Sequence, residues 1–166
     1  MADVRTLAVL RQAAVMGTRD TGRVMFEEST TADVVELVQG TVEAANRRDA
    51  DALMAFYAPD ALMDGTRTVG GLWRGRAAIR GLVDDWRDAY DELKWAADEP
   101  VDLGHGVAFA VVSQKASPVG VAGYVQQREG WVWVWVDDLI VSVAFYPEAH
   151  IDEARADAER LAEERG

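Results

Sequence analysis

The chain has 166 residues, a formal net charge of -12 and no cysteine, and these properties exclude several classes of protein. The length is that of one domain able to bury a core without disulfides, and a chain without cysteine has neither thiolate catalysis nor cysteine-ligated zinc. The acidic balance argues against nucleic acid and membranes as partners, since both attract basic surfaces. The apolar run of residues 6–10 is too short for a signal peptide or a membrane span, so we expect a cytoplasmic protein.

Helical periodicity is typical of the first half of the chain. Residues 1–28 lack it and are expected to form an N-terminal extension, either as a short helix or in a disordered state. Apolar residues recur at helical spacing over 34–45, and a short second helix is expected to end near Tyr57, before Pro59. A third, amphipathic helix follows Gly75. Its apolar side carries Ile79, Leu82, Val83, Trp86, Tyr90 and Leu93.

Strands are expected in the second half of the chain. Residues 61–74 contain a short strand and a Gly70-Gly71 turn, and from Leu93 onward the apolar period changes to two, which predicts an antiparallel sheet. Its strands are expected at 93–103, 107–116, 121–136 and 139–146. Gly130 interrupts the third of these and predicts a bulge or bend. Residues 148–166 then form a C-terminal amphipathic acidic helix, which leaves 29–147 as the main domain.

The segment from Trp131 to Tyr146 is predicted to be a hairpin that is apolar on both faces. Successive side chains of a strand alternate, so the indoles of Trp131, Trp133 and Trp135 share one face and the intervening valines share the other. Asp137-Asp138 is expected to close the hairpin. Because neither face is polar, each face requires a covering layer or a ligand.

Five segments, in this order along the chain, resemble the SnoaL-like proteins of the nuclear transport factor 2-like superfamily. They are NRRDADAL (46–53), YAPDA (57–61), WRGRAAI (73–79), DLG (102–104) and WVWVDD (133–138). The resemblance covers roughly residues 31–150. It implies an α+β fold in which a cone-shaped, curved antiparallel sheet has three helices covering its concave face, here with an extra C-terminal helix. Such domains are often homodimers, and their chemistry varies too widely for the fold to name one reaction.

Two carboxylates are candidates for acid/base catalysis. The isomerase-like and cyclase-like proteins that the chain resembles place an acid on the first short strand, at the position matched here by Gly65. Asp64 is one residue early, and such an offset turns a side chain to the opposite face, where it would be a solvated turn carboxylate. Glu129 lies two residues before Trp131 and should share the face of the indoles, where burial would raise its pKa. The alternatives for Glu129 are a pairing with an arginine or a place at the open rim.

The concave face is expected to hold a pocket for a hydrophobic small molecule. Alignment with the family's last hairpin assigns to this face Trp133, Trp135, Ile140, Ser142, Ala144 and Tyr146, joined by Val107, Phe109 and Val111. The candidate ligand-binding residues are Tyr57, Met63, Trp73, Trp86, Tyr90, Phe109, Trp131, Trp133, Trp135 and Tyr146. The two histidines are far apart in the sequence and give no metal signature, and no cofactor is expected.

The opposite face of the sheet is predicted to be apolar as well. It is assigned Ala108, Ala110, Val112, Val134, Val136, Leu139, Val141, Val143 and Phe145. A patch of this size should not face water, so we expect a homodimer through the outer sheet face. The alternative is that the N-terminal segment or the last helix of the same chain covers it.

Three functional hypotheses follow. The first is a protein that binds an apolar, ring-containing small molecule and performs cofactor-independent acid/base chemistry, such as isomerisation, cyclisation, dehydration or hydrolysis, with a tyrosine as hydrogen-bond donor. The second is a non-catalytic binding or scaffold module whose indoles fill the cone. The third is an interaction domain that uses the acidic C-terminal helix. An inward carboxylate beside an open cavity would favour the first, and a cone filled by tryptophans the second.

Overall fold

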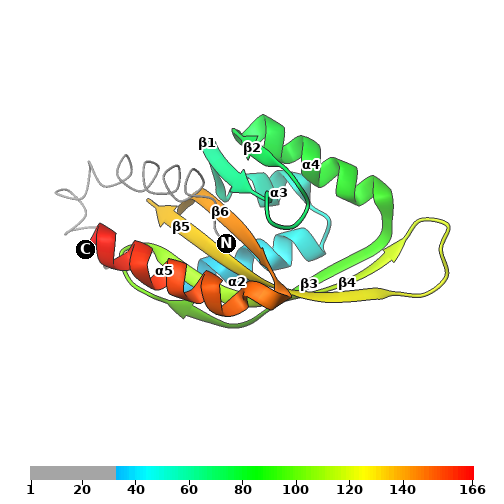
Figure 1. Ribbon diagram of the computed structural model, residues 1–166. Coiled ribbons are helices and arrows are strands. Elements are labelled where there is room, and N and C mark those ends of the chain that lie inside the picture. Colours follow the sequence, from blue (N-terminus) through cyan, green and yellow to red (C-terminus); the bar gives the residue numbers. More distant parts are fainter. Residues whose placement is uncertain (1–32) are drawn as a thin grey trace.

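The computed structural model describes residues 33–166, so the expectations for residues 1–28 lie outside the described part of the chain. Helices and a curved sheet make up an α+β fold (Figure 1). The first elements along the chain are α2 (Val34–Asn46), α3 (Ala50–Met54), β1 (Tyr57–Asp64), β2 (Leu72–Arg74) and α4 (Arg76–Ala89). They are followed by β3 (Tyr90–Asp102), β4 (Val107–Pro118), β5 (Val125–Val136), β6 (Leu139–Pro147), the short 3-10 helix η2 (Glu148–His150) and α5 (Ile151–Arg165).

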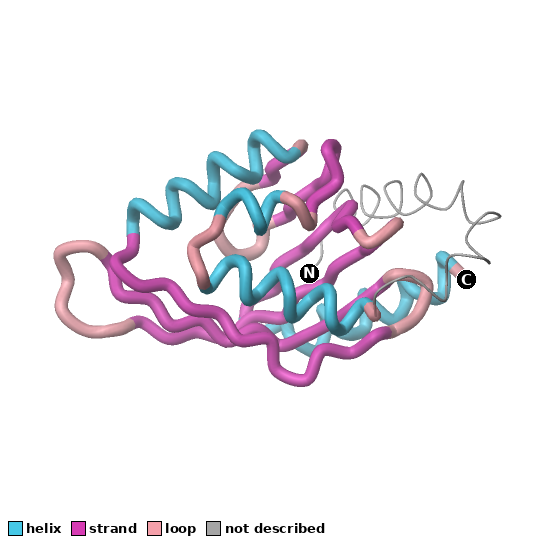
Figure 2. The backbone as a smooth tube through the Cα atoms, turned by 180° about the vertical axis from the view of Figure 1, so that it is seen from behind, coloured by secondary structure: helices cyan, strands magenta, loops and turns pink. Residues whose placement is uncertain are grey.

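The strands form one six-stranded sheet in the order β2-β1-β6-β5-β4-β3. Neighbouring strands are antiparallel except β1 and β6, which run parallel. The sheet is therefore mixed, whereas the sequence predicted an antiparallel sheet. The long connection between β1 and β6 includes all the other strands, and such a crossover is what a parallel pair requires. Helices α2, α3 and α4 lie on one side of the sheet and α5 on the other (Figures 1 and 2).

Two element boundaries differ from the sequence prediction around Pro59. The second helix ends at Met54 rather than near Tyr57, and Tyr57 instead begins β1. Pro59 therefore lies inside a strand. The pairing of β1 with β6 is irregular between Tyr57 and Leu62, and an irregular stretch of this kind can accommodate a residue that has no backbone N–H to donate.

The β5–β6 hairpin is closed by Asp137 and Asp138, as predicted. Both residues have positive φ, at 51° and 63°, which is the backbone conformation of a two-residue turn of type I′. Trp133 and Trp135 belong to the core under α2, α3 and α4, with Trp131 packed against it, whereas Val132 and Val134 belong to a second core on the opposite face. The alternation of β5 thus builds both cores of the protein.

The predicted faces of β6 are wrong beyond Ile140. Trp135 pairs with Ile140 but Val134 pairs with Ser142, so Val141 is an extra residue in β6. Such a bulge reverses the alternation downstream. Val143 and Phe145 consequently face the helices α2–α4, while Ala144 and Tyr146 face α5.

The predicted faces of β4 are also reversed. Ala108 pairs with Trp133 and Ala110 with Trp131, which places these alanines on the side of the indoles. Val107 and Phe109 then lie on the opposite face, in the core under α5. The sequence does not reveal this register, since residues of both parities in β4 are apolar. Small residues opposite large rings leave room for the indoles on the concave face.

The bulge or bend predicted at Gly130 is absent from the sheet. Gly130 pairs regularly with Val111 in β4 and Tyr146 in β6. A Cβ atom at this position would lie 2.9 Å from the Cβ of Ala154 in α5. The last helix therefore approaches the sheet closely at Gly130, and a close approach of this kind is the other common reason for a glycine within a strand.

The outer face of the sheet is covered by α5, which was the alternative to a homodimer. Ala154, Ala158, Leu161 and Ala162 of α5 pack on the core formed by Val107, Phe109, Val132, Val134, Ala144 and Tyr146. The bare apolar face on which the homodimer prediction was based is thus already buried within one chain.

No helix of the described residues is long and apolar enough to cross a membrane.

Substitution Ala158→Arg tests whether α5 holds this face. Ala158 is fully buried, so an arginine there must either bury an unpaired charge or displace the helix. We expect the free energy of unfolding in urea to fall by about 3 kcal/mol. The control is Ala156→Arg, because Ala156 lies in the same helix with its side chain exposed and the same change in helix propensity. Equal losses in the two variants would contradict the packing described for α5.

Candidate functional site

Two adjoining cavities lie between the sheet and the helices α2 and α4. The narrower one, of about 70 Å³, is almost entirely apolar in its lining. The larger one, of about 150 Å³, lies towards the β4–β5 end of the sheet and contains the polar side chains. The residues that line both cavities are Trp86, Leu93, Trp95, Trp131 and Phe145. Because they share this wall, the two cavities are neighbours and together form the candidate site.

Glu129 is the acidic residue of the larger cavity. It lies two residues before Trp131 in β5, so the alternation of the strand turns it to the face of the indoles, and only 6% of it is exposed. Its Oε2 accepts hydrogen bonds from Trp131 Nε1 at 2.8 Å and Gln114 Nε2 at 2.9 Å. Its Oε1 accepts from Gln127 Nε2 at 3.2 Å. All three donors are neutral groups.

Burial raises the pKa of Glu129 above its ordinary value, while the hydrogen bonds from Trp131 and Gln114 lower it in part. Desolvation is the larger effect because the apolar surroundings stabilise the carboxylate less well than water does. A carboxyl group with a raised pKa is a better proton acceptor when ionised and is more readily protonated near neutral pH. Glu129 therefore has the properties of a general acid or base.

The tryptophans of the concave face divide into two groups. Trp133 and Trp135 are 1% and 3% exposed and fill the closed end of the cone, where Trp135 meets Phe56 edge-on with ring centres 6.5 Å apart. The second group surrounds the larger cavity. Trp86 and Trp95 have ring centres 6.2 Å apart, and Trp131 and Phe145 have centres 4.4 Å apart. The cone is thus filled at one end and hollow at the other.

The predicted ligand-binding residues meet different outcomes. Those that line a cavity are Tyr57, Met63, Trp86, Tyr90, Trp131 and Trp133. Trp73 and Trp135 pack in or against the same core without lining either cavity. Phe109 and Tyr146 lie on the other face of the sheet, so their placement on the concave face was wrong. The reversed alternation of β4 and the bulge at Val141 account for these two errors.

Several residues that line the site were not among the predicted site residues, and Trp95, Phe145 and Gln114 are three of them. Trp95 lies two residues after Leu93 in β3, so both side chains are on the inner face of that strand. Counting by two from Leu93 would have placed it there. Phe145 was assigned to the outer face because the bulge in β6 leaves no trace in the sequence. Gln114 and Gln127, which hold Glu129, come from neighbouring strands and pair directly across β4 and β5.

Comparison with known proteins agrees with the fold. The sequence profile of the SnoaL-like domain matches residues 38–143, which is more than half of the chain. The chain belongs to the SnoaL-like domain family. Comparison with curated proteins gave no significant match.

Solved structures share the SnoaL-like fold at low sequence identity. A hypothetical protein from Catenulispora acidiphila with a ketosteroid isomerase-like fold, in complex with trimethylamine, is 14% identical, with 67% of this chain and 84% of that chain covered and a TM-score of 0.62. RV0760c from Mycobacterium tuberculosis, in complex with estradiol-17beta-hemisuccinate, is 14% identical with 71% and 95% covered and a TM-score of 0.61. The epoxide hydrolase/cyclase-like enzyme SalBIII of salinomycin pyran ring formation is 15% identical with 69% and 89% covered and a TM-score of 0.61. These likenesses establish the fold alone.

Asp64 lies on the face of the SnoaL-like sheet that is opposite the cavities. In β1, Met63 pairs with Val143 of the inner core, and Asp64 pairs with Ala144 of the outer core. Asp64 thus points away from the cavities, as its one-residue offset predicted. It is fully buried, however, and not the solvated turn carboxylate that was the alternative.

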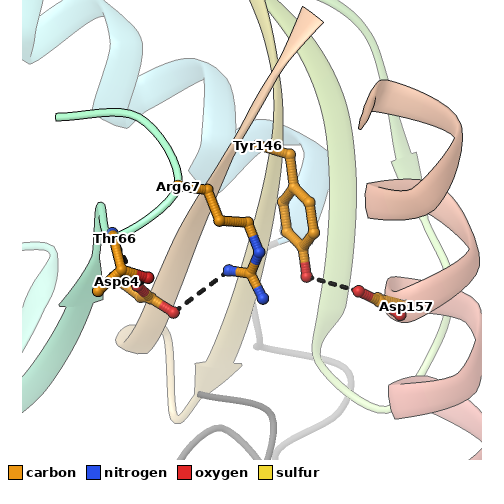
Figure 3. A network of polar contacts seen from close by, with 5 residues as sticks. All are labelled: Asp64, Thr66, Arg67, Tyr146 and Asp157. Carbon is orange, nitrogen blue, oxygen red and sulfur yellow. Dashed lines mark hydrogen bonds and ion pairs between the residues drawn. The ribbon is translucent and has the colours of Figure 1, made fainter. Parts of the chain in front are cut away.

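A polar network beside α5 explains the burial of Asp64 (Figure 3). Asp64 Oδ1 accepts from the backbone N–H and the hydroxyl of Thr66, at 3.0 and 2.6 Å, and Oδ2 forms an ion pair with Arg67 Nη1 at 3.4 Å. The guanidinium of Arg67 lies 4.3 Å from the ring centre of Tyr146, whose hydroxyl donates to Asp157 of α5 at 2.7 Å. This network joins the loop after β1 to the last helix.

Substitution Glu129→Gln tests the raised pKa through its effect on stability. A group whose pKa is raised by folding destabilises the folded state above that pKa, and the effect disappears below its ordinary value of 4.5. We expect the unfolding temperature of the wild type, relative to that of the Gln variant, to fall as the pH rises from about 4 to about 8, because only the wild type has the titrating group. A difference between the two proteins that does not change over this pH range would contradict the pKa shift.

Substitution Asp64→Ala tests whether Asp64 has a structural role. Removing the carboxylate leaves the guanidinium of Arg67, whose side chain is 11% exposed, without its ion pair. We expect the free energy of unfolding to fall by about 3 kcal/mol, measured in urea. The control Asp51→Ala removes an exposed ion pair with Arg80, which solvent screens, and should leave the free energy of unfolding nearly unchanged. Similar losses in the two variants would show that the buried network contributes no more than a surface pair.

Proposed function

We propose that this SnoaL-like protein binds an apolar, ring-containing small molecule in the two adjoining cavities and that Glu129 transfers a proton to or from it. The observation that carries the proposal is the position of Glu129. Among the described residues that line the larger cavity, it is the only acid, and its neighbours there are mainly aromatic and aliphatic. A pocket that is largely apolar with a few convergent polar groups is typical of small-molecule sites.

The size and lining of the site support a ring-containing ligand. A dry apolar cavity of roughly 150 Å³ is sufficient to hold a benzene molecule, and the larger cavity has about 150 Å³. The narrower cavity continues behind it with mostly aliphatic and aromatic walls. Flat rings stack favourably on indoles, so Trp86, Trp95 and Trp131 favour a planar or compact cyclic compound over a chain of polar groups.

The arrangement around Glu129 is suited to acid/base chemistry without a cofactor. Oε2 accepts two hydrogen bonds and Oε1 accepts only one, so Oε1 retains acceptor capacity for a proton of the ligand. Tyr90 lines the same cavity and is the tyrosine that would donate a hydrogen bond to a ligand oxygen. Isomerisation, cyclisation, dehydration and hydrolysis all fit a single buried carboxyl group with a hydrogen-bond donor in the same cavity. SalBIII, a fold neighbour, is described as an epoxide hydrolase/cyclase-like enzyme.

A second candidate is binding without chemistry. The observation in its favour is that Trp133 and Trp135 already fill the closed end of the cone, which leaves a small cavity. In that case Glu129 would orient the ligand and not react with it. A fold neighbour described as a computationally designed 17-OHP binder indicates that this fold can serve a binding function.

Tryptophan fluorescence tests the proposed ligand class. Titration with a panel of neutral ring compounds, such as indole, naphthalene and a steroid ketone, should give a saturable change in emission, because the indoles of Trp86, Trp95 and Trp131 line the cavities. Trp131→Leu should weaken binding about tenfold or more. Trp73→Phe is the control, because Trp73 lines neither cavity. The absence of any saturable change across the panel would contradict the proposed function.

A further inference from the structure

The buried carboxylate of Glu129 has no cationic partner among the described residues. Its hydrogen-bond donors are the indole of Trp131 and the amides of Gln114 and Gln127, which are all neutral. The ion pairs found in residues 33–166 do not include Glu129. Buried carboxylates are normally paired or bind a positive charge, because desolvation of an isolated charge is costly.

The arginines of the neighbouring cavity and of β5 itself are engaged elsewhere. Arg48 and Arg87 line the narrower cavity, but neither lines the cavity that contains Glu129. Arg48 donates to the backbone oxygens of Arg87, Tyr90 and Asp91 at the end of α4. Arg87 forms an ion pair with Asp84 at 3.0 Å. The neighbour of Glu129 in β5, Arg128, pairs with Glu148 at 3.6 Å.

The aromatic walls of the larger cavity favour a positively charged ligand, as the carboxylate of Glu129 does. Trp86, Tyr90, Trp95, Trp131 and Phe145 all line it. The faces of aromatic rings are electron-rich and attract cations, most strongly when water is excluded. Trp131 turns its N–H edge to Glu129 Oε2 at 2.8 Å, so the electropositive edge of this ring is directed at the carboxylate.

A protonated Glu129 that donates to a neutral ligand is the competing arrangement. Three N–H groups point at its two oxygens, and hydrogen bonds from donors stabilise the ionised form of a carboxyl group. A protonated carboxyl group would need an acceptor for its O–H, and the three contacts observed supply none. The hydrogen-bond geometry is thus that of an anion that lacks only a counter-charge.

We infer that the ligand of the larger cavity is a small organic cation, an alkylammonium or protonated amine whose charged group contacts Glu129 and lies among the rings of Trp86, Trp95 and Trp131. This inference rests on the proposed function and specifies its ligand class: the ring-containing molecule carries a basic nitrogen. A quaternary ammonium group contacts the carboxylate by charge, and a protonated amine also donates to Oε1. The net charge of -12 favours the approach of a cation.

Two probes of nearly the same shape test the inference. Phenyltrimethylammonium and tert-butylbenzene differ by one positive charge, and both match a cavity of about 150 Å³ that is lined by rings. We expect the cation to bind the wild-type protein about tenfold more tightly or better, measured by tryptophan fluorescence and by calorimetry. In Glu129→Gln the preference should fall to about threefold or less, since only the rings remain to favour the charge.

The control variant is Glu163→Gln, which removes the same charge from the exposed side of α5. It should keep the full preference, which separates a local effect of Glu129 from the general field of an acidic protein. Equal affinity of the wild type for the two probes would overturn the inference and leave the proposed function standing. A preference for the cation that is undiminished in Glu129→Gln would have the same meaning. If neither probe nor any ring compound binds, the proposed function fails as well. The comparison in the wild type needs no variant and remains decisive if Glu129→Gln does not fold.

Discussion

The constraint on which the structure depends is the need to bury both faces of β5. Indoles alternate with valines along Trp131–Val136, so neither face of the strand can lie against water without exposing large apolar groups. Helices α2, α3 and α4 cover the face of the indoles, and α5 covers the face of the valines. The remaining strands extend these two layers outward. The three-layer arrangement is therefore a consequence of one strand that is apolar on both sides.

The same strand positions the candidate site. Alternation continues from Trp133 through Trp131 to Glu129, so one face of β5 passes from a filled core to a lined cavity and then to a carboxylate. The side chains on this face become more polar towards the β4–β5 end of the sheet. Gln114 and Gln127 complete this gradient by supplying neutral donors where apolar packing ends. The hollow end of the cone is thus the end at which the core gives way to hydrogen bonds.

Much of the fold could be predicted from the sequence, but several side-chain directions could not. Periodicity located the helices and strands, and simple counting placed Glu129 beside Trp131. Counting failed in β6 because both parities around the bulge at Val141 are apolar, with Ser142 as the one polar residue of Leu139–Tyr146. It failed in β4 for a related reason, since Val107–Val112 is apolar at every position. The cover of the outer face was also ambiguous, because the apolar side of α5 consists mainly of alanines and gives a weak amphipathic signal.

The contact of Gly130 with Ala154 has a consequence for the position of the carboxylate. Glu129 and Gly130 are consecutive, so α5 rests on the back of the strand one residue from the group that faces the cavity. The contact with the helix therefore limits how far this part of β5 can bend away from Gln114. A side chain larger than glycine at position 130 would lift the helix and tilt the strand, and the carboxylate would move although no residue of the cavity had changed. The mechanical support of the site thus comes from an element that lies entirely outside it.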